Sequence, residues 1–323
     1  MGLRRRIVGP VPDRYGPMTS SIPRLILALP PAFHPTAGPE TALATAVGAE
    51  RAGFSGVAVT DHVVMGEGRD YPWGALPSPA HGPWLEPLTL LAAIGAATTK
   101  LRLCTAILIA PLRPAALLAK MAATVDRLCQ GRLELACGTG WQRKEFDAVG
   151  VPFDRRAAVL RETLLACRQL WSQSPASFDG EFVHITDAWC EPKPLRRGGP
   201  PVVLAGSVSE PNLKRMACLG DGWITPVVYD LARLSSDAGA VQDAWRDAGR
   251  GEHPMIWARL PAPTGRELHQ GLAGALEQLR QFRRCGVTDA LIPLRDFADH
   301  VADLDDFFAS AARLMEHQDK EVQ

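Results

Sequence analysis

The sequence lacks an excess of charge of either sign. Its 323 residues include 35 lysines and arginines and 35 aspartates and glutamates, so the formal net charge at pH 7 is zero. A protein that binds duplex nucleic acid usually carries a basic excess, because its affinity comes from neutralising phosphates. A protein held on an anionic membrane surface usually does so too. We therefore expect a small-molecule substrate, with no nucleic acid and no membrane as partners.

Long hydrophobic runs are also missing. No stretch reaches about 18 consecutive apolar residues without a proline or a charge, so no membrane-spanning helix is expected. The basic residues at 4–6 are soon followed by Pro10, Asp13 and Arg14, whereas a signal peptide needs an apolar region of about 7–15 residues. We interpret 1–22 as a disordered leader and 318–323 as a tail, and we expect a cytoplasmic protein.

Regular cysteine and histidine spacings are absent as well. The seven cysteines are odd in number, scattered and without Cys-x-x-Cys spacing, and the eight histidines form no His-Glu-x-x-His motif. A disulfide framework or a zinc site would show such spacings. We therefore expect reduced core cysteines and no metal site.

What the sequence does contain is a regular alternation of short apolar runs with longer helical segments. Strands are predicted at 25–29, 56–60, 101–108, 132–137, 201–205, 222–225, 255–260 and 287–293. Helices are predicted at 40–52, 85–99, 114–129, 155–171, 210–219, 231–248, 268–285 and 297–315. Eight strand–helix units of this kind indicate a parallel sheet closed into an α/β TIM barrel.

The alternation predicts one barrel domain over 23–317. A small hairpin insertion at 174–197, turning at Asp179-Gly180, follows the fourth barrel helix. A doubly wound sheet would usually have fewer strands, and no Gly-x-Gly-x-x-Gly motif opens the first unit. Because the chemistry of a TIM barrel takes place at the carboxyl ends of its strands, the residues at those ends are the site candidates.

Two of the strand ends carry candidates for catalysis or ring binding. The second strand ends in Asp61-His62, where the histidine could act as an acid or base near neutral pH or simply complete a turn. The third ends near Thr105-Ala106, where small side chains would let a flat molecule approach, or would only fill the barrel.

The next two strand ends are rich in glycine. The fourth strand leads into Gly138-Thr139-Gly140, which permits close backbone approach, and then into Trp141, which could stack on a planar ligand or cover the rim. The fifth leads into Gly206-Ser207 and a helix. Free amides and the positive end of a helix suit a phosphate there.

These motifs together resemble the bacterial-luciferase-like flavin and deazaflavin oxidoreductase superfamily, and most closely its coenzyme F420-dependent branch. The matching stretches are 50–62, 86–98, 101–105, 118–126, 131–141, 145–152, 178–182, 192–194, 204–207 and 219–223. They occur in the family's order over 23–226. The remainder of the chain fits the fold but carries little of the signature.

The resemblance implies a luciferase-like barrel with the cofactor ring lying across the strand ends. It implies a bulge after the third strand, often with a non-proline cis peptide, which by position would be Thr105-Ala106. It implies that the cofactor phosphate is bound at 206–208, by Gly206, Ser207 and Val208. His62 matches a position used as a catalytic acid or base beside the deazaflavin, and we expect Asp61 to orient it.

We therefore predict an F420-dependent oxidoreductase that transfers a hydride and reduces a C=C or C=N bond of a small organic substrate. The loop at 63–84 is predicted to cover an aromatic substrate pocket. Its expected lining is Trp73, His81 and Trp84 together with Trp141. Trp141 stands where some F420-dependent sugar-phosphate dehydrogenases have a carboxylic acid, which disfavours a sugar phosphate as substrate.

Several expectations accompany this prediction. The acidic tail of F420 needs basic partners, and the candidates are Arg113, Arg143, Lys144 and Lys214. The alanine-rich helices near 89–98 and 115–123 would suit a homodimer interface or an ordinary barrel exterior. Two alternatives stay open, namely an FMN-dependent monooxygenase that uses O2 and a non-catalytic barrel that serves as a binding protein.

Overall fold

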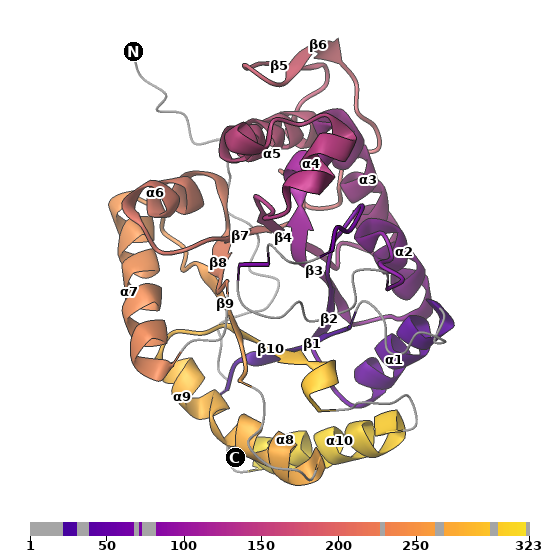
Figure 1. The fold of residues 1–323 in the computed structure, drawn as a ribbon. Helices are drawn as coiled ribbons and strands as arrows, with labels where there is room; N and C mark the ends of the chain where they lie inside the picture. Colours follow the sequence, from indigo (N-terminus) through magenta and orange to yellow (C-terminus); the bar gives the residue numbers. More distant parts are fainter. Residues whose placement is uncertain are drawn as a thin grey trace.

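Eight parallel strands close into a barrel in a computed structural model of the chain. The model describes residues 22–30, 39–67, 71–72, 82–226, 230–261, 268–297 and 303–320. The order of strands around the barrel is β1-β10-β9-β8-β7-β4-β3-β2 (Figure 1). Their bounds are β1 Arg24–Ala28, β2 Gly56–Val59, β3 Arg102–Ile109, β4 Leu133–Gly138, β7 Val202–Ala205, β8 Gly222–Ile224, β9 Met255–Arg259 and β10 Asp289–Pro293. The predicted TIM barrel is confirmed.

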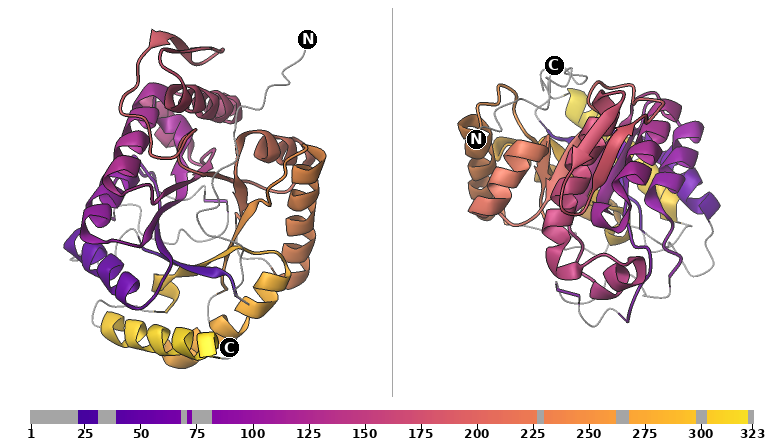
Figure 2. Two further views of the ribbon diagram at one scale, coloured as in Figure 1. Left: turned by 180° about the vertical axis from the view of Figure 1, so that it is seen from behind. Right: turned by 90° about the horizontal axis from the view of Figure 1, so that it is seen from above.

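Helices cover the outside of the barrel (Figures 1 and 2). They are α1 Pro39–Arg51, α2 Pro87–Ala97, α3 Ala115–Leu128, α4 Arg143–Val149, α5 Arg156–Ser172, α6 Glu210–Leu219, α7 Leu231–Asp247, α8 Leu268–Glu277, α9 Leu279–Arg284 and α10 Leu304–Lys320. Most match the predicted spans within two residues, because helical periodicity over three or more turns is a strong signal.

Two helical predictions need correction, and one helix was not predicted. The single helix expected at 268–285 is two helices, α8 and α9. The last helix spans Leu304–Lys320, not 297–315, and a separate 3-10 turn at Leu294–Asp296 directly follows β10. The seven-residue α4 was not predicted, since two turns are too short to show a periodic pattern.

The predicted hairpin insertion is present as β5 Ala176–Asp179 and β6 His184–Ala188, which pair antiparallel. It projects beyond α5, away from the barrel (Figures 1 and 2). The carboxylate of Glu162 on α5 accepts hydrogen bonds from the amides of residues 181–183 in its turn, at 2.9, 2.7 and 3.2 Å. This contact fastens the turn of the hairpin to the barrel.

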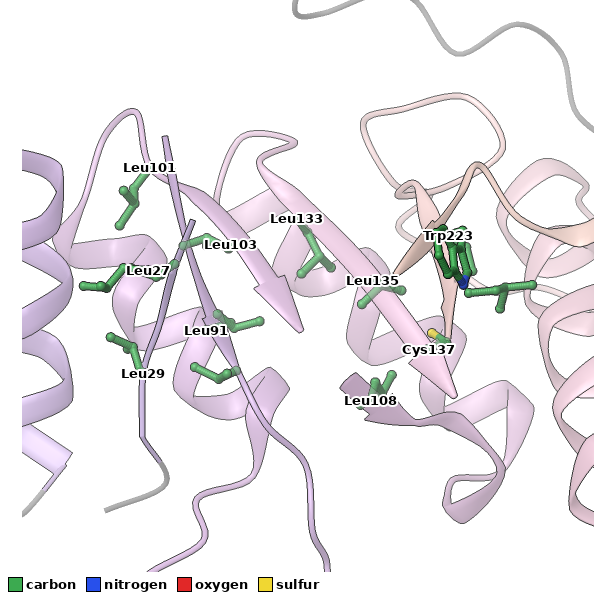
Figure 3. Close-up of a cluster of buried hydrophobic side chains, with 14 of the residues drawn as sticks. Leu27, Leu29, Leu91, Leu101, Leu103, Leu108, Leu133, Leu135, Cys137 and Trp223 are labelled. Carbon is green, nitrogen blue, oxygen red and sulfur yellow. The ribbon is translucent and has the colours of Figure 1, made fainter. Parts of the chain in front are cut away.

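Side chains alternate between two apolar layers along every strand. Outward-facing residues such as Leu27, Leu103 and Leu135 pack between the sheet and the helices, together with Leu91 of α2 (Figure 3). One inward-facing residue from each strand fills the barrel: Ile26, Ala58, Cys104, Ala136, Val203, Ile224, Trp257 and Leu291. Full burial of a valine, leucine or isoleucine side chain contributes about 1.5–3 kcal/mol.

A buried ion-pair network closes the amino-terminal end of the barrel. Arg102 pairs with both Glu134 and Asp289, and Arg24 Nη2 lies 2.8 Å from Asp289 Oδ2. Burial alone would raise the pKa of Asp289, but the guanidinium groups of Arg102 and Arg24 outweigh it and hold that pKa below its usual value. The opposite, carboxyl end of the barrel is therefore the open one.

No helix of the described residues is both long enough and apolar enough to cross a lipid bilayer.

Candidate active site

A cavity of about 690 Å³ opens at the carboxyl ends of the barrel strands. Every strand contributes a lining residue two positions beyond its inner-layer residue. These are Ala28, Thr60, Ala106, Gly138, Ala205, Pro226, Arg259 and Pro293. Most of them are small, so the alternation that fills the barrel interior leaves open space one layer above it. The volume lies within the range of about 300–1,000 Å³ found for ligand pockets.

His62 lies at the wall of this cavity and is held by Glu145. Nδ1 of His62 is 3.1 Å from Oε2 of Glu145, whose other oxygen accepts from the amide of Val63 at 2.9 Å. Glu145 is fully buried at the start of α4. Because a carboxylate only accepts, the shared hydrogen is on Nδ1, and Nε2 is the ring nitrogen that remains to exchange a proton. Glu145 was not among the predicted site residues.

The expected orienting role of Asp61 needs correction. Asp61 is buried, and its carboxylate accepts from Arg113 Nη1 at 2.6 Å, from Arg113 Nη2 at 3.0 Å and from the amide of Ile109 at 2.9 Å. Arg113 also contacts Glu86, which caps α2. Burial raises the pKa of Asp61, and Arg113 opposes that rise. Asp61 therefore ties β2 to the end of β3, while Glu145 orients His62.

The segment between β4 and α4 fastens the loop that follows His62. Gln142 donates to the carbonyl of Val64 at 3.1 Å and accepts from the amide of Gly66. Gly140 permits this path, because its φ is +76° and a Cβ there would lie 2.7 Å from Cγ2 of Ile109. The glycine therefore sets the course of the chain into Trp141 and Gln142.

Aromatic rings surround the imidazole of His62. The rings of Trp84 and Trp141 meet it edge-on, with centroids 4.7 and 5.8 Å away. Tyr71 meets Trp141 at 5.3 Å, and all three aromatic residues line the cavity. Trp84 and Trp141 thus lie in the predicted pocket. The other two predicted pocket residues, Trp73 and His81, lie outside the described part of the chain.

The bulge at the end of β3 falls one residue later than predicted. The peptide between Ala106 and Ile107 is cis, and the register with β4 shifts between Ala106 and Leu108. Ala106 and Ile107 line the cavity, together with Gly138 and Thr139 from the end of β4. Thr105 does not, because it is fully buried and its hydroxyl donates to the carbonyl of Ala136 at 2.9 Å.

The predicted phosphate site lies between β7 and α6. Gly206 and Ser207 line the cavity, whereas the side chain of Val208 packs against the core. Asn212 donates to the carbonyl of Ser207 at 2.8 Å and so holds the turn. No side chain caps the amides at the start of α6, where Ser209 is the N-cap residue. An uncapped helix start beside a cavity suits an anion.

The basic residues predicted for the cofactor tail do not line the cavity. Arg113 is buried against Asp61, Arg143 pairs with Asp154 at the exposed surface, Lys214 pairs with Glu210 on α6, and Lys144 lies beside Gly66. The lining instead includes three arginines that were not predicted: Arg233, Arg259 and Arg295. Arg259 could have been found, because it continues the inward alternation of β9 two positions after Trp257.

The family model of the luciferase-like monooxygenases matches residues 24–322, and the chain belongs to this family. A Mycobacterium tuberculosis protein described as uncharacterized is 35% identical over 223 residues, which cover 69% of this chain and 74% of that protein. The FMNH2-dependent dimethylsulfone monooxygenase of Pseudomonas putida is 38% identical over 125 residues, 38% of this chain and 34% of that one.

A solved structure shows the same fold. An F420-dependent secondary alcohol dehydrogenase in complex with an F420–acetone adduct aligns with a TM-score of 0.69 at 18% identity, over 91% of this chain and 99% of that one. Family membership makes the protein an oxidoreductase with a flavin-type cofactor, either F420 or FMN. The cavity fits such a group, because it joins a floor of small residues to an uncapped helix start. Within the described residues, no group of acidic, histidine and cysteine side chains could hold a metal ion.

Proposed function

We propose that the protein is a coenzyme F420-dependent oxidoreductase that reduces a C=C or C=N bond of a small organic substrate. The observation that carries this proposal is His62, which stands at the wall of a flavin-sized cavity with Nδ1 held by a buried carboxylate. A histidine fixed in this way is suited to give or take a proton at Nε2.

The described residues provide for the two ends of the cofactor. Ala106, Ile107 and Gly138 would present apolar side chains and backbone to a planar ring. The turn at Gly206 and Ser207, together with the start of α6, would receive the phosphate through backbone amides and the positive helix end. When bound, reduced F420 supplies a hydride, which carries two electrons.

His62 would complete the reduction with a proton. Adding a hydride to one atom of a double bond leaves negative charge on the other, or on an atom conjugated with it. In its imidazolium form, His62 would protonate that atom from Nε2–H and keep the hydrogen on Nδ1, and solvent would then return a proton to Nε2. Trp84 and Trp141 shield the imidazole on two sides and so limit its exchange with bulk water.

The proposed preference for F420 over FMN rests on the same residue. Reduction of a double bond requires a proton donor beside the ring, and the Glu145–His62 pair provides one. A 5-deazaflavin does not activate O2, which sets this chemistry apart from that of the FMN-dependent monooxygenases. Fluorescence titration of the purified protein with F420 and, separately, with FMN tests the choice. We expect saturable F420 binding. Tight FMN binding without affinity for F420 would refute the proposal.

A substitution that introduces a negative charge at Ser207 tests whether this turn binds the phosphate of F420. Ser207→Asp sets a carboxylate beside the expected phosphate, and we expect at least about a tenfold loss of F420 affinity, because like charges brought together at an interface cost several kcal/mol. Ser235→Asp on the exposed face of α7 is the matched control and should leave the affinity unchanged. If the two variants bind F420 with equal affinity, the phosphate is not bound at this turn.

A further inference from the structure

Two arginines on one side of the cavity share a single acid. Arg259 ends β9 and Arg295 lies in the 3-10 turn after β10, and both line the cavity. Arg259 Nη2 donates to Asp296 Oδ2 at 3.0 Å, and Arg295 Nε lies 3.4 Å from Asp296 Oδ1. Together the three side chains carry one net positive charge at the wall of the cavity.

The side chains that carry this positive charge are partly buried. Burial lowers the pKa of Arg295, and the positive charge of Arg259 lowers it further. Nε of Arg259 is buried without a hydrogen-bond partner in the described part of the chain. Burial raises the pKa of Tyr71 while the two arginines oppose that rise, so this cavity-lining phenol remains a neutral donor near them. Arg259, Arg295 and Tyr71 therefore place two guanidinium groups and a phenol hydroxyl on one side of the cavity.

The cluster also faces the proposed cofactor site across the barrel. In the order of strands, β3, β4 and β7 carry the small residues and the phosphate turn, whereas β9 and β10 lie on the other arc, separated from β7 by β8. His62 follows β2, which together with β1 lies between the two arcs on the other side. Asp61, the acid that lines the cavity within the described residues, is already paired with Arg113. An anion beside Arg259 and Arg295 would therefore meet no unpaired carboxylate there.

We propose that Arg259 and Arg295 bind a carboxylate of the substrate, which makes the substrate an unsaturated carboxylic acid or imino acid. This inference rests on the proposed function for the reduction step. A planar guanidinium fork matches a carboxylate in shape, and one net positive charge matches a monoanion better than a phosphate dianion. Binding on this arc would place the remainder of the substrate between the cofactor ring and His62.

The test compares a carboxylate with its neutral analogue. Benzoate and benzamide have nearly the same shape, and calorimetric titration measures the affinity of each for the protein with and without F420. We expect benzoate to bind at least about tenfold more tightly, because a hydrogen bond between two charged groups is stronger than one to a neutral amide. Equal affinities, or no saturable benzoate binding, would overturn the proposal.

Substitutions of the two arginines test whether they cause the preference for benzoate over benzamide. Arg259→Gln and Arg295→Gln should each weaken benzoate by about tenfold and leave benzamide unchanged. Arg155→Gln, which removes an exposed arginine paired with Glu181 in the hairpin, is the matched control and should change neither. Asp296→Asn keeps both arginines and removes the competing acid, so it should tighten benzoate binding. A loss of benzoate affinity in Asp296→Asn would contradict the proposal, even if the arginine variants do not fold.

The same variants distinguish a substrate carboxylate from the acidic tail of the cofactor. Unchanged F420 affinity in Arg259→Gln and Arg295→Gln supports the assignment to the substrate. A fall in F420 affinity with unchanged benzoate affinity would assign the arginines to the cofactor and overturn it. If the protein binds FMN instead of F420, the proposed function fails in its own titration, while the benzoate selectivity measured without cofactor still decides the role of the arginines.

Discussion

Nδ1 of His62 lies 3.1 Å from Oε2 of Glu145, although the two residues are 83 positions apart in the chain. His62 follows β2 and Glu145 lies in the first turn of α4, so their contact joins the segments after two strands that are not neighbours in the sheet. The second oxygen of Glu145 holds the amide of Val63. One buried carboxylate thus fixes both the imidazole and the backbone beside it.

Replacing His62 by alanine should reduce turnover and leave the cofactor in place. Turnover is the oxidation of reduced F420 by an enone such as cyclohex-2-enone, followed by absorbance. We expect a loss of about 10²–10⁴-fold, the usual contribution of a general acid or base, and nearly unchanged F420 affinity. His184→Ala removes an exposed histidine of the hairpin and is the control. Turnover equal to that of the natural protein would exclude His62 from the mechanism.

Glu145 should act through His62, as a positioning residue. Glu145→Gln retains one carbonyl oxygen for the two hydrogens that the carboxylate now accepts, and Glu145→Ala retains none. We expect kcat to fall by about tenfold in Glu145→Gln, further in Glu145→Ala, and KM to change little, because loss of a charged hydrogen bond costs about 1.5–3 kcal/mol. The exposed Glu181→Gln serves as control. Equal kcat in both Glu145 variants and the natural protein would contradict this role.

Asp61→Asn should affect stability first. Removing one partner of a buried ion pair leaves a buried charge, and we expect the free energy of unfolding to fall by about 3 kcal/mol in urea titrations. Asp154→Asn breaks the exposed pair with Arg143 and should cost no more than about 1 kcal/mol. A normal unfolding free energy combined with a large loss of kcat would instead support Asp61 as a group that orients His62.

The hairpin turn should loosen in acid. Three backbone amides outweigh the effect of burial and hold the pKa of Glu162 below its usual value. The ionised form is therefore favoured in the folded state. The stability it contributes is complete above the unfolded pKa of about 4.3 and is lost as the pH falls through the lower, folded value.

Hydrogen-exchange protection of the amides at 181–183, measured between about pH 6 and pH 3, follows this loss. Glu162→Gln should lower the protection and remove its pH dependence. Glu210→Gln, which changes an exposed glutamate on α6, should leave both unchanged. Protection in the natural protein that is constant across this range would show that Glu162 does not hold the turn.

Much of the fold could be predicted because its signal is local. Apolar runs such as 25–29, which contain both Leu27 and Ile26, are buried on two faces, and this is the pattern of a parallel strand. Eight repeats with helices between them leave few ways to close the sheet. The elements that differed are α4, the break between α8 and α9 and the start of α10, and each depends on only a few residues with little periodicity.

Most of the site residues that could be predicted are those that directly follow a strand. His62, Gly138 and Ser207 follow strands directly, so the barrel rule locates them. Glu145 lies on an unpredicted helix, and although it opens the matching stretch 145–152, nothing in the sequence indicates that it contacts His62. Arg295 lies in the 3-10 turn at 294–296, between the predicted strand that ends at 293 and the predicted helix that starts at 297, and it was not among the candidates.

The sequence by itself determined the barrel, the cavity at its carboxyl end and the candidates that follow the strands, because periodicity and chain order are local properties. Only the tertiary structure decided which side chains form hydrogen bonds with one another in the site. It paired His62 with Glu145 and gave Asp61 to Arg113, because hydrogen bonds between distant loops depend on where closure of the barrel brings them. It also showed that the zero net charge hides a local positive cluster at Arg259, Arg295 and Asp296.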